Sequence, residues 1–393
     1  MRKKFLLPVL MLISIPGFLF SQAKLVEKVV KNGDEIIIPY EKYVLPNGLT
    51  VIVHEDHSDP IVHVDLTYHV GSAREEIGKS GFAHFFEHMM FEGSEHVADK
   101  EHFKIVTESG GTLNGSTNTD RTNYYETVPS NQLEKMLWLE ADRMGFLFNA
   151  VTQPKFEIQR ATVTNERGQN YDNRPYGLAG EVASKALYPY GHPYSWLTIG
   201  YVEDLNRVNV NDLKNYLLRW YGPNNAALTV GGDVNTKQVI QWVEKYFGSI
   251  PRGQEVAPVK LPPVKLTADR YVSYVDNYAR LPQLRIVYPT VPEYNKDMAA
   301  LACLAQVFGG GGGGGRGGRG GGGGGNQTSV LYQSLIKTQK ALQASTFSSL
   351  NELTGEFTFS VTPYQDHNLA EMQTELKNAM AEFEKRGVTD DDL

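Results

Sequence analysis

The alternation of apolar and polar positions predicts a first half in which strands are interrupted by helices. Residues 43–54 alternate on either side of Pro46-Asn47-Gly48, which predicts a β-hairpin with an Asn-Gly turn. Residues 61–70 (IVHVDLTYHV) predict a buried strand. Other runs predict helices at about 80–92, 100–109, 130–146, 154–170, 178–187, 210–220 and 235–247, and strands at 112–118, 121–128 and 225–231.

A proline-rich segment at 250–266 separates this half from a second one and is the expected linker. After it, strands are expected at 269–276, 283–289, 342–348 and 355–362, and helices at 296–307, 329–338 and 368–385. The order of elements restarts, although no sequence motif repeats. We therefore expect an α+β protein of two related domains, 24–249 and 267–393, each an antiparallel sheet packed with helices.

The two ends of the chain carry their own signals. Arg2-Lys3-Lys4, the apolar stretch 5–20 and Ser21-Gln22-Ala23 are typical of a cleaved signal peptide, residues 1–23; an uncleaved anchor is the alternative. This pattern predicts export to a bacterial periplasm or the cell exterior, with no stable membrane anchor after cleavage. At the other end, 389–392 (TDDD) is typical of a helix start, so we expect a second domain that is C-terminally incomplete.

Composition narrows the possible chemistry. The 393 residues are 41% apolar and 21% charged, as in globular proteins, and their net charge of −7 argues against nucleic-acid binding. Cys303 is the one cysteine, so any metal must be held by histidine and carboxylate. Residues 309–325 are glycine except for two arginines, and we expect a flexible loop there rather than a phosphate-binding or RNA-binding element.

The segment His84-Phe-Phe-Glu87-His88 carries the strongest chemical signal. Histidines spaced i, i+4 project from one face of a helix and supply two ligands of a zinc site. The neighbouring Glu87 can accept a proton from an attacking water. The surrounding residues are strongly apolar, so the helix is expected to be buried, where these polar side chains would be costly without a metal.

A third ligand is expected from the predicted helix at 154–170, which offers Glu157 and Glu166. Phe156 and Val163 mark its buried face. Glu166 lies within about 80° of both, whereas Glu157 lies about 180° from Glu166. Helical phase therefore favours Glu166 as the third ligand. The alternative is that Glu166 is a surface carboxylate paired with an arginine.

Together these residues resemble the pitrilysin/insulinase family of zinc metallopeptidases. The resemblance covers most of residues 40–393 and rests on the His84–His88 motif and on Asn165-Glu166-Arg167. Three other segments also resemble the family: 110–117 (GGTLNGST), 120–124 (DRTNY) and 221–226 (YGPNNA). The family often has a second glutamate seven residues before the zinc glutamate, where this chain has Gln159.

The resemblance implies one Zn²⁺ per chain, held by His84, His88 and Glu166, with Glu87 as general base. It places Asn114, Gly115, Ser116 and Thr117 in an edge strand that pairs with a peptide or unfolded protein substrate; an ordinary edge strand is the alternative. It also implies a second homologous half or subunit around the substrate. The expected activity is peptide-bond hydrolysis. A non-catalytic, peptide-binding partner subunit and a small-molecule metalloenzyme with the same motif are the rivals.

Overall fold

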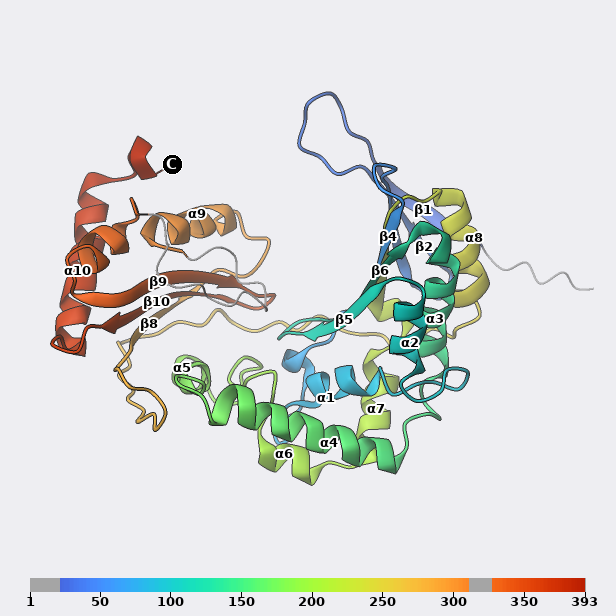
Figure 1. Ribbon diagram of the computed structural model, residues 1–393, viewed down its shortest axis with the longest axis horizontal. Coiled ribbons are helices and arrows are strands. Elements are labelled where there is room, and N and C mark those ends of the chain that lie inside the picture. The colour runs from blue at the N-terminus through green and yellow to red at the C-terminus, as the bar shows by residue number, and fades with distance from the viewer. Residues whose placement is uncertain (1–21, 311–326, 393) are drawn as a thin grey trace, which may run out of the picture.

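A computed structural model describes residues 22–310 and 327–392, arranged around two β-sheets (Figure 1). The expected α+β class is confirmed. The proposed signal peptide and most of the glycine-rich run lie outside the described residues. Within the described part of the chain, no helix is long and apolar enough to cross a membrane.

The larger sheet has the strand order β1-β2-β3-β7-β4-β6-β5. Its strands are β1 (Lys24–Val29), β2 (Tyr40–Val44), β3 (Thr50–Glu55), β4 (Ile61–Tyr68), β5 (Thr112–Thr117), β6 (Thr122–Pro129) and β7 (Ala226–Gly232). The Asn47-Gly48 hairpin is confirmed by the antiparallel pairing of β2 with β3. The sequence pattern missed β1.

The first sheet was expected to be antiparallel, and it is so except at one pair, because β3 and β7 run parallel. β7 also pairs antiparallel with β4, so it lies between two strands that run in opposite directions. A strand inserted between two such neighbours must be parallel to one of them. The insertion, rather than any local sequence preference, decides the mixed character of the sheet.

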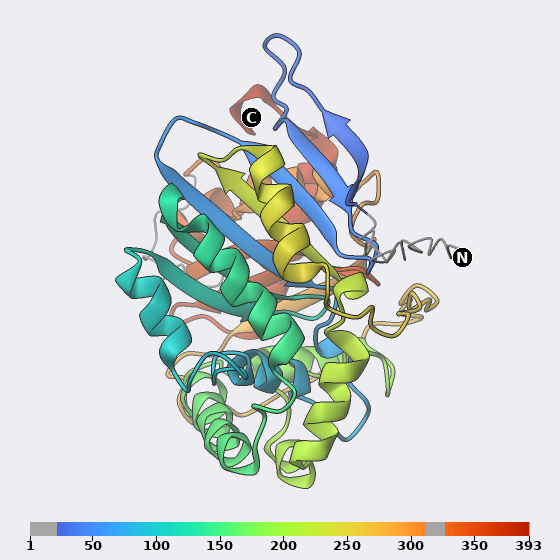
Figure 2. The ribbon, with the colours of Figure 1, turned by 90° about the vertical axis from the view of Figure 1, so that its right-hand side faces the viewer.

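Helices cover one face of this sheet and its lower end. α3 (Leu133–Phe146) and α8 (Thr236–Phe247) lie across the face that Figure 2 turns toward the viewer, and the opposite face is turned toward the second sheet. The helices below and beside it are α1 (Phe82–Met89), α2 (Glu101–Glu108), α4 (Gln153–Arg167), α5 (Ala179–Leu187), α6 (Val202–Arg207) and α7 (Val210–Trp220). Short 3-10 turns occur at Ser72–Arg74, Ser130–Gln132, Pro223–Asn225 and Asp390–Asp392, and π-helical turns at Gly168–Asp172 and Tyr332–Ile336.

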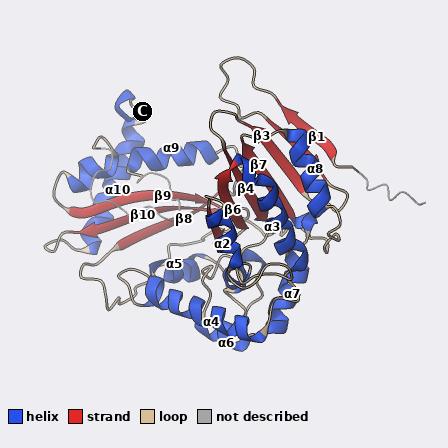
Figure 3. Cartoon of the chain, turned by 45° about the vertical axis from the view of Figure 1, so that its right-hand side comes forward, coloured by secondary structure: helices blue, strands red, loops and turns tan. Residues whose placement is uncertain are grey.

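The smaller sheet has three antiparallel strands in the order β8-β10-β9 (Figure 3). They are β8 (Leu284–Thr290), β9 (Ala341–Leu350) and β10 (Gly355–Pro363), packed with α9 (Met298–Phe308) and α10 (Leu369–Arg386). Phe357, Phe359 and Val361 alternate inward along β10 and form the centre of a separate core with Leu331 and Leu376.

The predicted strand at 269–276 was wrong, since residues 251–283 contain neither helix nor strand. Its apolar side chains stay in solvent: Tyr271 is 76% exposed and Val275 is 83% exposed. In the first sheet, β3 is held between β2 and β7. The stretch at 269–276 pairs with no described strand, although β8 pairs only with β10 among them, and a strand-like sequence without a hydrogen-bonding partner does not form a strand.

Polar contacts join the two parts of the chain. Glu352, between β9 and β10, lies 2.6 Å from His69 Nε2 and 3.2 Å from the Arg74 guanidinium. Tyr194 accepts a hydrogen bond from the Leu353 backbone at 3.0 Å. The turn after β9 is therefore tied to the β4–α1 region of the first sheet.

Candidate metal centre

The helix α1 separates an apolar face from a polar one. Phe82, Phe85, Phe86 and Met89 are fully or almost fully buried in the main core. The polar positions between them direct the histidines and Glu87 toward α4 and β5, which both pack against α1. The helix therefore forms because its apolar positions have a core to fill.

The start of α1 is anchored by a residue that the sequence pattern did not identify. Gly81, the residue before the helix, has φ +89° and no side chain with which to cap it. The carboxylate of Glu75 accepts hydrogen bonds instead from the backbone N–H groups of Gly81 (3.0 Å) and Ala83 (2.8 Å). It also accepts from the Trp196 indole at 2.9 Å. Burial raises the pKa of Glu75 to about 8, against the three N–H donors that lower it.

His84, His88 and Glu166 come together at one point. Each histidine Nε2 lies 3.4 Å from Glu166 Oε2, and one ligand atom from each of the three residues falls within 4.8 Å of the others. The two imidazole rings stand nearly perpendicular, at 82°, with centroids 4.8 Å apart. Among the described residues this is the one group of three or more potential metal ligands.

The position of Glu166 follows from the phase of α4. Phe156 and Val163 are buried on the inner side of that helix. Glu157 lies on the outer side, where it pairs with Arg160 and accepts a hydrogen bond from Gln153 at 2.7 Å. The structure thus brings Glu166, and not Glu157, to the two histidines, and its role as a metal ligand stays a prediction.

The three side chains fit a zinc ion. Two imidazoles and one carboxylate are a known catalytic zinc set, and two atoms bound to tetrahedral zinc at about 2.0–2.1 Å lie about 3.3–3.4 Å apart. The distance of 3.4 Å from Glu166 Oε2 to each histidine matches that spacing. The burial of His84, whose side chain is 6% exposed, also suits a ligand shielded from water.

Gln159 supports the second histidine. Burial lowers the pKa of His88, but hydrogen bonds to Glu166 and Gln159 and the charge of Glu87 outweigh it and leave the pKa raised. Gln159 also donates to Glu92 at 2.7 Å. Gln159, which stands where the family often has a glutamate, is therefore a neutral amide that donates a hydrogen bond to Glu92 beside the cluster.

Glu87 lies against β5, the last strand of the larger sheet. Thr117 Oγ1 donates a hydrogen bond to Glu87 Oε2. A Cβ atom added to Gly115 would come 3.3 Å from Glu87 Oε1 and 3.1 Å from Phe91, so glycine lets the strand approach the carboxylate. This contact links the proposed general base to the strand beside it.

The segment predicted to bind substrate is an edge strand. Among the described strands β5 pairs only with β6, and Asn114, Gly115, Ser116 and Thr117 all belong to β5. Arg121 braces the strand by donating to the Ser116 carbonyl at 3.0 Å. The edge position agrees with the sequence analysis, and substrate binding stays a prediction.

Comparison with known proteins decides the family. Residues 50–187 match the family model described as "Insulinase (Peptidase family M16)" and residues 207–393 match "Peptidase M16 inactive domain". The chain belongs to the insulinase family, peptidase family M16. The resemblance inferred from the motifs is confirmed, and every residue of the cluster falls within the first match.

Individual members of the insulinase family show how far the likeness extends. "Zinc protease PqqE" of Helicobacter pylori is 33% identical over 276 residues, which are 69% of this chain and 61% of that protein. The crystal structure of a protease from Helicobacter pylori has a TM-score of 0.79 at 28% identity, covering 91% of this chain and 82% of that one.

The periplasmic protease PqqL from Escherichia coli shares the fold, with a TM-score of 0.71 at 19% identity over 93% of this chain and 39% of that one. The alignments span 61%, 28% and 49% of the first three curated relatives. The chain therefore matches less than two thirds of the length of these relatives.

Proposed function

We propose that this chain is the zinc-binding part of a metallopeptidase that hydrolyses peptide bonds. The observation that carries the proposal is the convergence of His84, His88 and Glu166, with Glu87 beside them and an open strand edge next to Glu87. The naming of relatives as zinc proteases supports it.

His84, His88 and Glu166 would hold one Zn²⁺. When bound, zinc supplies Lewis acidity, which polarises a carbonyl and makes water acidic near neutral pH. Glu87 would take the proton of the attacking water and return it to the leaving amine. Thr117, which donates to Glu87, would keep that carboxylate oriented.

The substrate would be a peptide or an unfolded protein segment that lies along β5. An exposed strand edge accepts an extended peptide through main-chain hydrogen bonds, with little dependence on its side chains. Asn114 to Thr117 would provide this edge, and Gly115 would let the peptide and Glu87 lie close together.

A second homologous half or subunit would complete the chamber, because enclosure excludes water and holds the substrate in place. The coverage of only 39% of PqqL supports this. The basic, apolar start of the sequence and the periplasmic site named for PqqL support export to a periplasm or the cell exterior.

The test is to measure zinc content and cleavage of a quenched fluorescent peptide, for the chain alone and for the longest natural polypeptide that contains it. Zinc binding with cleavage by the longer protein is the expected result. Zinc binding with peptide binding but no cleavage in either would favour the non-catalytic partner subunit. Absence of stoichiometric zinc would overturn the proposal.

A further inference from the structure

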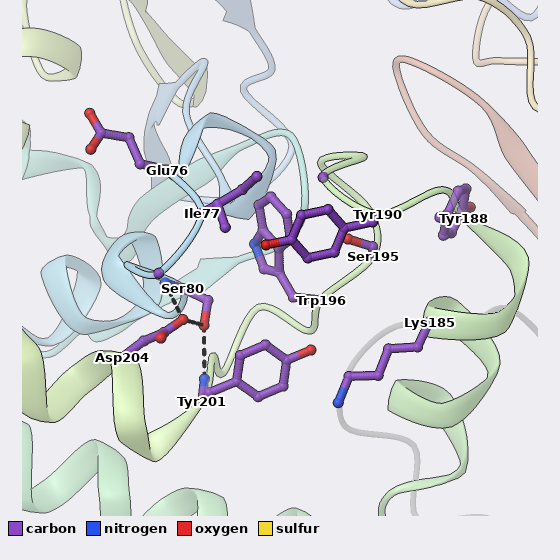
Figure 4. Close-up of a pocket in the computed structure, with 12 residues that line it drawn as sticks. Glu76, Ile77, Ser80, Lys185, Tyr188, Tyr190, Ser195, Trp196, Tyr201 and Asp204 are labelled. Atoms are coloured by element: carbon purple, nitrogen blue, oxygen red, sulfur yellow. Dashed lines mark hydrogen bonds between the residues drawn. The ribbon is translucent and has the colours of Figure 1, made fainter.

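A pocket of about 450 Å³ lies at the N-terminal end of α1 (Figure 4). Four aromatic side chains line it: Tyr188, Tyr190, Trp196 and Tyr201. They all lie in the segment between the end of α5 and the start of α6, whereas the opposite wall is the segment just before α1. None of these residues belongs to the metal cluster.

The mouth of the pocket exposes apolar surface to water. Tyr190 is 93% exposed and Ile77 is 60% exposed. Ile77 Cδ1 lies against Gly191, where an added Cβ would be 3.2 Å away, so the two exposed side chains flank one opening. Apolar side chains gathered at the mouth of an aromatic pocket are typical of a binding site.

The floor of the pocket is already fixed. Ser80 donates to Asp204 through both its backbone N–H (3.1 Å) and its hydroxyl (2.6 Å), and the same hydroxyl accepts from the Tyr201 backbone at 2.9 Å. A preformed floor lowers the entropy cost of binding. Because Ser80 and Gly81 lead directly into α1, the pocket and the metal cluster share one rigid element.

One polar group marks the wall on α5. Lys185 Nζ lies 2.8 Å from Glu181 and 4.6 Å from the centre of the Tyr201 ring. Glu181 in turn binds Arg167, the neighbour of Glu166, at 2.8 Å. An ammonium group has three N–H donors, so Lys185 can also donate to the main-chain carbonyl of a peptide.

We propose that this pocket is a subsite that takes an aromatic side chain of the polypeptide substrate, at a residue away from the cleaved bond. The inference rests on the proposed peptidase function, which supplies the polypeptide. The aromatic walls favour an aromatic ring through stacked and edge-to-face contacts. The Ser80–Gly81 segment leads into α1, and Lys185 and Glu181 connect to Arg167, the chain neighbour of Glu166, so the pocket walls are joined to the two helices that carry the metal centre.

The experiment measures peptide binding separately from cleavage. The zinc-loaded Glu87→Gln chain is titrated with labelled alanine-rich peptides that carry one phenylalanine, moved one position at a time. One register should bind more tightly than the all-alanine peptide. Tyr190→Ser in the same background should weaken that peptide about five- to tenfold, the size of a lost aromatic contact with its buried area. The substitution should leave the affinity for the all-alanine peptide unchanged.

Two comparisons keep a negative result interpretable. Ile77→Ser should repeat the effect in weaker form, and Tyr271→Ser, at a tyrosine 76% exposed in the linker, should have none. If neither the chain nor the longest natural polypeptide that contains it cleaves peptides, the proposed function fails while the binding series still tests the pocket. Equal binding of phenylalanine and alanine peptides, or an unchanged affinity in Tyr190→Ser, would overturn the subsite.

Discussion

The two sheets of this chain share an architectural type but differ in what they hold. The larger sheet has its α1, α4 and β5 arranged around the described chain's one group of potential metal ligands. The smaller sheet has three strands, a modest core and a preceding segment whose apolar side chains stay in water. The comparison teaches that the potential metal ligands of the described chain are concentrated in the first part, to which the second part is tied by polar contacts.

The largest expected effect is the loss of zinc from the first part. His84→Ala, His88→Ala and Glu166→Ala each remove one of three protein ligands and should abolish stoichiometric zinc binding. Glu157→Ala, on the opposite side of α4, is the matched control and should bind zinc fully. Metal analysis of the purified variants checks this. Equal zinc in Glu166→Ala and Glu157→Ala would contradict the assignment.

Glu87→Gln should keep the zinc and lose the reaction. The amide preserves the shape of the side chain but does not accept a proton, so peptide cleavage should fall about 10²–10⁴-fold. The assay is single-turnover cleavage by the proposed complete enzyme at matched zinc occupancy. Undiminished cleavage by the zinc-loaded variant would remove Glu87 from the mechanism.

Glu75→Gln tests how the metal-bearing helix is anchored. A neutral amide has one acceptor oxygen in place of two, so α1 should lose part of its N-terminal anchor, at a cost of about 1–3 kcal/mol. Glu76→Gln, at the adjacent residue on the pocket rim, should be nearly neutral. Thermal unfolding of the two variants provides the comparison.

A comparison of the parent chain with Glu75→Gln over a range of pH tests the protonation of Glu75. The pKa of Glu75 is about 8 in the folded chain, above the unfolded value of about 4.3, so the folded state binds the extra proton. The Glu75 contribution to stability is full below the unfolded pKa and is lost as the pH rises toward 8. The melting temperature of the parent chain should therefore fall more steeply over this range than that of Glu75→Gln. Parallel curves would contradict the raised pKa.

Glu352→Ala tests the contact between the two parts. It removes the carboxylate that pairs with the Arg74 guanidinium, whose side chain is 3% exposed, and with His69. The contact should weaken by about 1–2 kcal/mol, and limited proteolysis of 251–283 should speed up while zinc binding is kept. Glu384→Ala, on the outer side of α10, is the control. Unchanged proteolysis would show that other contacts hold the two parts together.

The smallest expected effect concerns the glycine-rich run. Replacing residues 311–325 by a Gly-Ser connection without the two arginines should leave zinc content and thermal unfolding unchanged, because the metal cluster lies in the first part. A marked drop in melting temperature would show that the run contributes to packing.

The sequence by itself determined the elements of the site whose spacing is local. Helical phase alone placed His84 and His88 on one face and separated Glu166 from Glu157, because a helix repeats every 3.6 residues whatever surrounds it. The Asn47-Gly48 hairpin was likewise predicted from local residues, since Gly48 supplies the positive φ that its turn needs. A strand at 112–118 was also expected from its residues, whereas its place at the edge of the sheet was implied by the family resemblance.

Only the tertiary structure decided what depends on distant partners. β7 enters between β3 and β4, and this insertion makes the sheet mixed. The strand-like stretch at 269–276 stays irregular because it forms no hydrogen-bonded pairing with a described strand. Glu75 accepts a hydrogen bond from the backbone of Gly81 and so caps α1, and loops assemble the aromatic pocket. No periodic pattern in the sequence predicts the cap or the pocket. Hydrogen-bond partners far apart in sequence are chosen by the fold, so local residue patterns do not encode them.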